Sequence, residues 1–220
     1  MDLLFSKQDA QPVGLTVVGL MTTPVAPSVE QGQSFFGVRF RPAMASALIP
    51  EVVLLTDKVE PLESFWGSRA NALLNGLAEC SCVENMVRII EQQLRPLEPA
   101  AVLDRALSRL SSENAELNRV AAEHGMSTRH FRRRCQVRSG VSPKLLSRIL
   151  RFRRAVERIR IREGGHAQPN WADFAAACGF YDQAHFIHEF QTFSGVTPGR
   201  FLQSTRSGQL VKSDCERNQA

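Results

Sequence analysis

The spacing of hydrophobic and polar residues changes part-way along the chain. In residues 1–58 the apolar residues form short β-branched and aromatic runs, LTVVGL at 15–20 and FFGVRF at 35–40, bounded by Gly, Pro and Thr. Such runs predict β-strands. From residue 62 onward the apolar residues recur at every third or fourth position, which predicts amphipathic helices.

Two helices are expected between residues 62 and 94. Pro61 stands at a position suited to the first turn of a helix. The apolar stripe of these helices is consistent with pairing of two subunits and with plain core packing, and core packing is the commoner use of such a stripe. The stripe consists of Leu62, Phe65 or Trp66, Leu73, Leu77, Val87, Ile90 and Leu94.

A domain boundary is expected at residues 94–100, LRPLEPA, because two prolines interrupt the helical pattern there. The resulting division is a domain of strands and then helices at 1–97, a helical domain at 98–205 and a flexible tail at 206–220. The predicted fold class is therefore an α+β N-terminal domain followed by an all-α domain.

The helical domain includes a long helix at 143–161, with Ser142 as its N-cap and Pro143 in its first turn. One apolar stripe runs along its whole length, and its opposite face is rich in arginine. A loop with the sequence GGHAQPN follows. The other expected helices span 103–110, 117–121 (ended by Gly125), 128–135, 170–178 (capped by Asn170 and ended by Gly179) and a segment bearing Phe186, Phe190 and Phe193.

The helical domain also contains an internal repeat. Residues 121–146 align with residues 175–202 at nine identical positions, first at an offset of 54 residues and then at 55, so one residue is inserted in the turn of the second copy. Each copy reads as helix, glycine-containing turn, helix, which is the pattern of a helix-turn-helix. In each copy a phenylalanine, Phe131 or Phe186, is expected to fill the angle between the helices. A chance match of two Ala- and Gly-rich segments is the alternative, which nine identities disfavour.

The charge of the chain is distributed unevenly. Residues 1–100 carry 7 Lys and Arg against 11 Asp and Glu, whereas residues 101–220 carry 20 against 11. Thirteen of those 20 cations lie between Arg129 and Arg162. A basic part joined to an acidic part indicates a nucleic-acid-binding module attached to a separate domain.

Neither a membrane span nor a metal site is expected. No window approaches the run of uncharged apolar residues that a membrane span requires, and the N-terminus has no basic and apolar leader, so we expect a cytoplasmic, nucleoid-associated protein. The five cysteines lack a disulfide spacing. Cys80 and Cys82 form C-x-C without a second ligand pair, which favours packing over zinc, and Cys135 is expected in the core. No cofactor is expected.

The repeat, above all GFYDQAHFIHEFQTFSGVTPGRF at 179–201, resembles the C-terminal DNA-binding domain of AraC/XylS-type bacterial transcription regulators. The resemblance covers about residues 100–203. It implies two helix-turn-helix units joined by the helix at 143–161, which sets two recognition helices into successive major-groove segments of double-stranded DNA. A 19-residue helix spans roughly 28 Å, of the same order as the roughly 34 Å between major-groove entries one turn apart.

DNA-contacting residues are expected at the start of each second helix. In the first unit Ser127 is the expected N-cap, and Arg129, Arg132 and Arg133 share the solvent face, where arginine bonds bidentately to guanine. The alternative for this basic face is contact with phosphates alone. The residues predicted to contact DNA are Thr128, Arg129, Arg132 and Arg133 in the first unit and, by resemblance, Gln183, Ala184, His185 and His188 in the second; Arg134, Arg138, Arg151 and Arg154 are the predicted phosphate contacts.

The second unit departs from the family in charge. From residue 171 to residue 201 it carries Arg200 as its one cation against three carboxylates, and family members often have arginine where His188 stands. His185 and His188 are also candidates for catalytic residues or metal ligands, and His185 is a candidate for partial packing in the turn. No H-E-x-x-H pattern and no third ligand accompany the two histidines, so no catalytic or metal site is predicted.

The N-terminal part resembles, less closely, the regulatory or dimerisation domain of one branch of the family, through GVRFRP and LTDKVEPLESFWG. Ala43 stands where relatives often have glycine. Family members usually begin well upstream of MDLLFS, so a truncated or unusually short sensor domain is expected. RNA polymerase, a small-molecule effector and a second copy of the chain are partners that the resemblance allows.

The function indicated is a sequence-specific DNA-binding transcription regulator without catalytic activity. An architectural protein that binds DNA with little sequence preference is the alternative. An enzyme fused to such a domain, as in DNA alkyl-repair regulators, would need a cysteine-rich zinc cluster, which C-x-C alone does not supply.

Overall fold

The structure is a computed structural model that describes residues 1–25, 29–94, 101–112, 116–161 and 169–207. The chain divides into two compact units. The first consists of Met1–Met21, Pro27–Ala101 and Arg133–Val141, and the second of Thr22–Ala26, Val102–Arg132 and Ser142–Ala220. The predicted boundary between residues 97 and 98, and most of LRPLEPA, lies outside the described residues.

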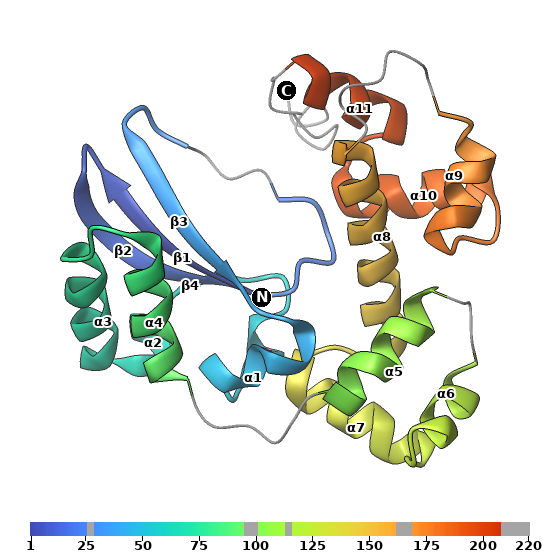
Figure 1. Cartoon of the computed structure of the whole chain (residues 1–220), viewed down its shortest axis with the longest axis horizontal. Helices are drawn as coiled ribbons and strands as arrows, with labels where there is room; N and C mark the ends of the chain where they lie inside the picture. The colour runs from blue at the N-terminus through green and yellow to red at the C-terminus, as the bar shows by residue number, and fades with distance from the viewer. Residues whose placement is uncertain (26–28, 95–100, 113–115, 162–168, 208–220) are drawn as a thin grey trace. The chain divides into compact units, whose positions relative to one another are not determined.

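The first unit is built on a four-stranded antiparallel sheet, which confirms the β-rich prediction (Figure 1). The strands are β1 (Asp2–Gln8), β2 (Gln11–Val18), β3 (Gln33–Arg39) and β4 (Val59–Pro61), in the order β3-β1-β2-β4. Leu3 and Phe5 of β1 and Leu15 and Val17 of β2 are buried, whereas the residues between them are partly exposed. One face of the sheet therefore supplies the core.

Helices cover that face of the sheet (Figure 1). They are the 3₁₀ helices η1 (Pro42–Met44) and η2 (Val52–Leu55) and the α-helices α1 (Ala45–Leu48), α2 (Glu63–Trp66), α3 (Ser68–Ala78) and α4 (Val83–Gln93). The apolar stripe expected between 62 and 94 lies in the core with the strands, as Leu62, Leu73, Leu77 and Ile90 show. Core packing is thus the use that the structure makes of the stripe.

Two details of this segment differ from the prediction. Pro61 ends the short edge strand β4 instead of starting a helix, and an edge strand tolerates proline. The backbone N–H of Leu62 then donates to the carbonyl of Leu15 at 2.8 Å. The first of the two expected helices begins at residue 62 and includes Leu77, but Gly67, with φ at 52° and ψ at −134°, divides that stretch into α2 and α3. The short helices between residues 42 and 55 were not predicted.

The helical part of the chain contains seven further helices among the described residues: α5 (Ala101–Ser112), α6 (Leu117–Glu123), α7 (Thr128–Ser139), α8 (Pro143–Ile161), α9 (Trp171–Cys178), α10 (Gln183–Ser194) and α11 (Pro198–Ser207). The long helix at 143–161 is confirmed as α8. Ser142 Oγ accepts a hydrogen bond from Leu145 N–H at 3.3 Å, and Asn170 Oδ1 accepts one from Ala172 N–H at 3.0 Å. Both predicted N-caps are therefore formed.

The helix α11 was not predicted as a helix. It extends two residues beyond the boundary expected at residue 205. The rest of the expected tail, at 208–220, and residues 162–168, which include most of the GGHAQPN loop, lie outside the described residues.

An aromatic core holds α8, α9, α10 and α11 together (Figure 1). Phe186 of α10 lies at its centre, with ring centroids 5.1 Å from Phe180, 5.5 Å from Phe174 and 5.8 Å from Trp171. Aromatic pairs at these separations add to the stabilisation that burial of the rings gives. Phe180, Phe186, Phe190 and Phe193 are all buried.

The turn between β1 and β2 generates a stability prediction. Asp9 and Ala10 form this two-residue turn, with φ at 48° and 68°. Left-handed backbone of this kind costs a residue with a Cβ about 1–2 kcal/mol. Ala10→Gly should therefore raise the free energy of unfolding by about 1 kcal/mol, measured by urea denaturation.

A matched exchange in a helix should have the opposite sign. Ala72→Gly, at an exposed position of α3, should lower the free energy of unfolding by about 1 kcal/mol. A loss of stability in both variants would contradict the strain assigned to Ala10.

Candidate nucleic-acid interface

The two copies of the repeat form the same turn. In the first copy Gly125 follows the end of α6, with φ at 68°, and in the second Gly179 follows the end of α9, with φ at 85°. The next residue in each copy bonds back to the first helix: Met126 N–H to Ala121 O at 2.9 Å, and Phe180 N–H to Ala175 O at 3.0 Å. Matching main-chain bonds across the two copies support a true duplication.

Side-chain bonds at the ends of the second helices match as well. Ser127 Oγ accepts from His130 N–H at 3.2 Å, and Asp182 Oδ1 accepts from His185 N–H at 2.7 Å, so each second helix has an N-cap. At the C-terminal ends, the hydroxyls of Ser139 and Ser194 donate to the carbonyls of Cys135 and Phe190 at 2.8 and 2.7 Å. Both helices are therefore fixed at both ends in the same way.

The residue inserted in the second copy is Tyr181. It stands between the residue after the glycine and the N-cap, where the first copy has no residue. Its side chain is 80% exposed. The insertion lengthens the turn and places an aromatic ring at the start of α10.

The helix α7 divides its residues between a buried and an exposed side. Phe131 and Cys135 are fully buried, whereas Arg129, Arg132 and Arg133 are exposed. Burial raises the pKa of the Cys135 thiol to about 11, so it remains a protonated core residue, as predicted. The three arginines are thus available to a partner. The remaining predicted residues of this helix, Thr128, Arg134 and Arg138, are partly exposed.

The helix α10 presents a surface with little charge. Gln183, Ala184 and His188 are exposed, and His185 is partly buried. Nδ1 of His185 accepts a hydrogen bond from Tyr181 N–H at 3.3 Å, and its ring lies 5.6 Å from that of Phe180. His185 therefore belongs to the turn as well as to the helix, and only its Nε2 is left to donate outward.

An ion pair that the charge count did not reveal joins α10 to α8. Arg148 Nε lies 3.1 and 2.8 Å from the two carboxylate oxygens of Glu189, and Nη2 lies 2.8 Å from Oε1. The Glu189 side chain is 8% exposed and that of Arg148 33%. The charge count of the sequence treats Glu189 like any exposed carboxylate. In the structure its carboxylate points into the protein, where Arg148 neutralises its charge.

Arg151 and Arg154, predicted to contact phosphates, also turn toward the protein. Arg151 is only 8% exposed, and its guanidinium lies 5.9 Å from the ring of Phe180. This burial argues against a phosphate contact by Arg151, since such a contact needs an accessible guanidinium. Arg154 is partly exposed, and its Nη1 donates to the carbonyl of Cys178 at 3.2 Å, near the C-terminal end of α9.

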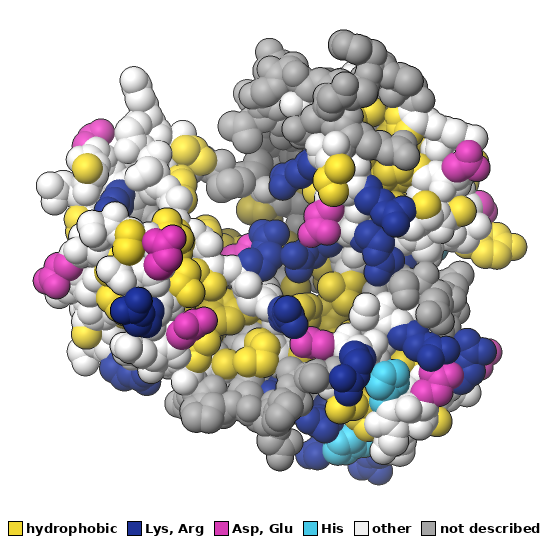
Figure 2. All heavy atoms as spheres, in the orientation of Figure 1, with side chains coloured by type: hydrophobic (Ala, Val, Ile, Leu, Met, Phe, Trp, Pro, Cys, Tyr) yellow, Lys and Arg dark blue, Asp and Glu magenta, His cyan; other side chains and the backbone are white. Residues whose placement is uncertain are grey.

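Lys and Arg side chains gather over α8 and over the part of the chain that contains α5, α6 and α7, in the face shown in Figure 2. In contrast, the segment from Trp171 to Phe201 carries Arg200 as its one cation. Of the two second helices, α7 carries exposed arginines, whereas α10 has no Lys or Arg.

Residues 120–204 match the family described as "Helix-turn-helix domain", a family of the AraC type. The match spans both copies of the repeat. Residues 120–204 form an AraC-type helix-turn-helix domain. The resemblance stated from the sequence is thereby confirmed for this region, and a domain of this family supports a DNA-binding transcription regulator. No curated protein matches the chain significantly.

N-terminal to the matched residues, α5 contacts α6 through the Arg109–Glu123 ion pair and α8 through a hydrogen bond. Leu103, Ala106, Leu107 and Leu110 of α5 are buried, and Ser147 Oγ of α8 donates to the carbonyl of Leu110 at 3.0 Å. The predicted domain began at residue 98, earlier than the match at 120–204. The hydrogen bond from Ser147 joins α5 to α8, which lies within the matched residues.

Among the described residues, no group of three or more His, Cys, Asp or Glu side chains is close enough to hold a metal ion. Cys80 Sγ donates to the carbonyl of Gly76 at 3.3 Å, and Cys82 is exposed. None of the helices in the described ranges has the length and apolar character needed to cross a lipid bilayer.

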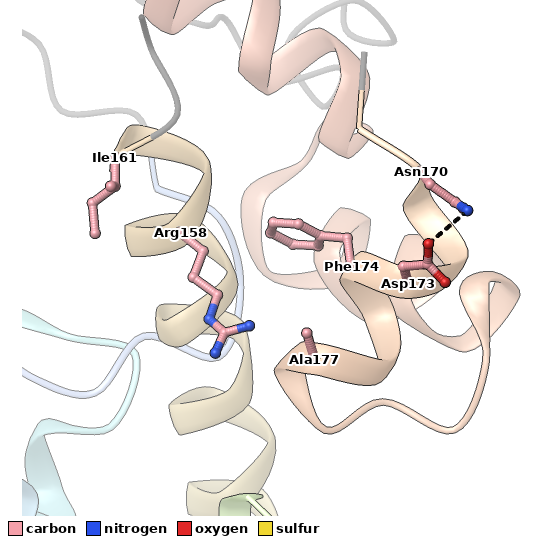
Figure 3. A pocket seen from close by; sticks show the side chains of 6 residues that line it. All are labelled: Arg158, Ile161, Asn170, Asp173, Phe174 and Ala177. Carbon is pink, nitrogen blue, oxygen red and sulfur yellow. Dashed lines mark hydrogen bonds between the residues drawn. The ribbon is translucent and has the colours of Figure 1, made fainter. Parts of the chain in front are cut away.

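A groove of about 430 Å³ lies between the end of α8 and α9 (Figure 3). Arg158 and Ile161 of α8 and Phe174 and Ala177 of α9 line it, and the ring of Phe174 points toward α8. Near the start of α9, Asn170 Nδ2 donates to Asp173 Oδ2 at 2.8 Å. All of the lining residues except Phe174 are exposed, so this is an open surface groove with mixed charge.

The titration of Glu189 reflects its position. Burial alone would raise the pKa of its carboxyl, but the hydrogen bonds and charge of Arg148 hold that pKa below its ordinary value. The bond to Glu189 likewise raises the pKa of Arg148, whereas burial lowers the pKa of Arg151. The pair is therefore ionised near neutral pH.

The residues that sequence reasoning missed are Arg148, Glu189 and Tyr181. Glu189 directly precedes Phe190 on a helix whose apolar residues were correctly assigned to the core. A carboxylate three residues after Phe186 and beside Phe190 falls on the buried side of a helix, and that was the available signal. The alignment of the two copies places one inserted residue in the second turn, but it does not identify that residue as Tyr181.

The ion pair generates a prediction of pH-dependent stability. Because the folded-state pKa of Glu189 lies below the ordinary value of 4.5, its charge stabilises the fold above that pH and loses this effect as pH falls through the folded-state pKa. Glu189→Gln should lower the free energy of unfolding by about 1–3 kcal/mol near neutral pH, because the amide keeps only one acceptor oxygen for Arg148. The deficit should shrink on acidification, measured by urea denaturation at a series of pH values.

The control is Glu157→Gln, which changes an exposed carboxylate of α8. It should have little effect at any pH, since exposed charges contribute little. A deficit in Glu189→Gln that stays constant between neutral and acidic pH would show that the amide disturbs packing and not charge.

Proposed function

We propose that this protein is a sequence-specific DNA-binding transcription regulator in which α7 and α10 enter successive major-groove segments on one face of the duplex. The observation that carries the proposal is the duplication of one helix-turn-helix, with equivalent turn and cap bonds in both copies. In such units the second helix supplies the residues that reach base edges. Binding to DNA then needs no catalytic group.

The helix α7 is the main source of affinity and guanine recognition in this proposal. Arg129, Arg132 and Arg133 are exposed near its N-terminal end. An arginine in the major groove donates two parallel hydrogen bonds to O6 and N7 of guanine. Thr128, next to the N-cap, is placed to contact the backbone or a base edge.

The helix α10 adds selectivity more than charge. Gln183 is exposed at its first position, where an amide can bond bidentately to adenine or contact a phosphate. Ala184 lets the helix approach closely, and His188 is exposed one turn further on. His185 contributes outward only through Nε2, since Nδ1 is bonded within the turn.

Phosphate contacts fall to the partly exposed arginines Arg134, Arg138 and Arg154. Such contacts position the protein and make affinity depend on salt, without selecting a sequence. Arg151 is not included because it is buried.

The wider organisation follows from this reading. Residues 1–97 act as a regulatory or dimerisation domain, residues 98–205 as the DNA-binding domain, and the protein works at the bacterial nucleoid. RNA polymerase, a small-molecule effector and a second copy of the chain are its proposed partners.

The direct test is selection of bound fragments from random DNA, followed by footprinting against competitor DNA. Two protected major-groove segments about one helical turn apart, with a defined sequence in each, are expected. Uniform protection with no enriched sequence would instead identify an architectural DNA-binding protein.

Arg132 provides a test of base recognition. Arg132→Ala should weaken binding to the selected operator by about 1–3 kcal/mol and relax the sequence preference at one base pair. Gel-shift titration against single-base variants of the operator measures both effects. The control is Arg88→Ala, which removes an exposed arginine from α4 and should leave binding unchanged. Full discrimination by the Arg132 variant would remove this residue from the base contacts.

Arg134 provides a test of phosphate contact. Arg134→Gln should weaken binding to the operator and to unrelated DNA alike, because a phosphate is present in every sequence. The slope of log affinity against log salt should fall by about one. A loss confined to the operator, with the slope unchanged, would assign Arg134 to base recognition instead.

A further inference from the structure

The contact between Arg148 and Glu189 is directional. One guanidinium donates three hydrogen bonds, at 2.8 to 3.1 Å, to the two oxygens of one carboxylate. Planar pairs of this kind fix both the separation and the relative angle of the two groups. The pair therefore ties the second turn of α8 to the middle of α10 in one geometry.

The apolar contacts between the same two helices are less selective. Phe152 of α8 lies 5.1 Å from Phe190 and 5.3 Å from Phe193, measured between ring centroids. Aromatic pairs are favourable over a broad range of separations and angles. These rings hold α10 against α8, but they permit small rotations of α10 that the ion pair does not.

The Arg148–Glu189 pair adds little to the free energy of unfolding compared with an apolar pair, but it selects one orientation of α10. Removing a carboxylate and a guanidinium from water costs about as much as their attraction returns, so an apolar pair of similar size often gives equal stability. The attested use of such a pair is to select one arrangement among several. An apolar replacement would thus keep α10 folded and lose its fixed orientation.

We propose that Arg148 and Glu189 are positioning residues that set the angle at which α10 meets DNA. This inference rests on the proposed DNA-binding function. Glu189 lies on the inner side of α10 with Phe186 and Phe190, while Gln183, Ala184 and His188 are exposed. A rotation of α10 about its axis would move the exposed residues sideways relative to the base edges. The second half of the operator depends on the pair, and the first half does not.

The test uses the full chain and a pair of double variants of identical composition. R148M/E189M replaces the buried pair with apolar side chains. E157M/R158M removes the same two charges from exposed positions of α8. Melting temperature, hydrogen exchange of the α10 amides and affinity are measured for both, on the selected operator and on operators with one half scrambled.

R148M/E189M is expected to melt near the wild-type temperature and to bind the intact operator at least about tenfold more weakly. On the operator whose second half is scrambled it should match the wild type. Its α10 amides should exchange faster, while E157M/R158M should behave as wild type in exchange. A stable R148M/E189M with wild-type affinity on the intact operator would overturn the proposal.

If R148M/E189M does not fold, a second variant tests the proposal. Glu189→Gln retains the volume and shape of the side chain but loses the charge, and it should also lose affinity for the second half of the operator alone. Equal losses on both halves, or none, would overturn the proposal. R148E/E189R, which reverses the pair, should recover part of the affinity that Glu189→Gln loses.

Failure of the proposed function would have a different signature. If the wild-type chain enriches no DNA sequence, the proposed function fails, and exchange in the free protein alone decides the positioning role. In Glu189→Gln, exchange that is accelerated more in α10 than in α9 supports a positioning role, and equal acceleration in the two helices, as global destabilisation alone would give, excludes it.

Discussion

Each two-helix unit depends on a glycine that ends its first helix in the left-handed conformation. Gly125 and Gly179 turn the chain so that the following residue bonds back to an alanine of the first helix. A residue with a Cβ in that conformation costs about 1–2 kcal/mol. The turn brings Phe131 or Phe186 into the angle between the helices, where each is fully buried. With the inner side fixed in this way, the outer side of the second helix remains exposed.

The two copies share a backbone but differ in how they use charge. The helix α7 exposes arginines, whereas α10 exposes an amide, a methyl group and an imidazole and directs its carboxylate inward. On α8, Arg148 and Arg151 are drawn into the protein by Glu189 and by the ring of Phe180. The basic surface exposed to solvent is consequently smaller than the arginine count of the sequence indicates. More of it belongs to the first helix-turn-helix than to the second.

The helical domain was predictable because its signals are local and repeated. Helix stops at Gly125 and Gly179, caps at Ser127, Ser142 and Asn170, and the long stripe of α8 each act within a few residues. The unpredicted features depend on distant partners. Pro61 joins β4 because β2 lies beside it, and Glu189 is buried because Arg148 lies on another helix. The repeat itself held one unused signal: Pro143 opens α8 and the aligned Pro198 opens α11, so the second proline marks a helix start as well.

The turn bonds of both copies are made by main-chain atoms, glycines and small hydroxyl or carboxylate caps. None of them involves the outward side chains of α7 or α10 apart from the Nδ1 of His185. Substitutions on those outward surfaces therefore leave the folding determinants untouched. Under the proposed function, the sequence preference of one half-site could then be changed, by mutation or by grafting, while the other half-site keeps its own.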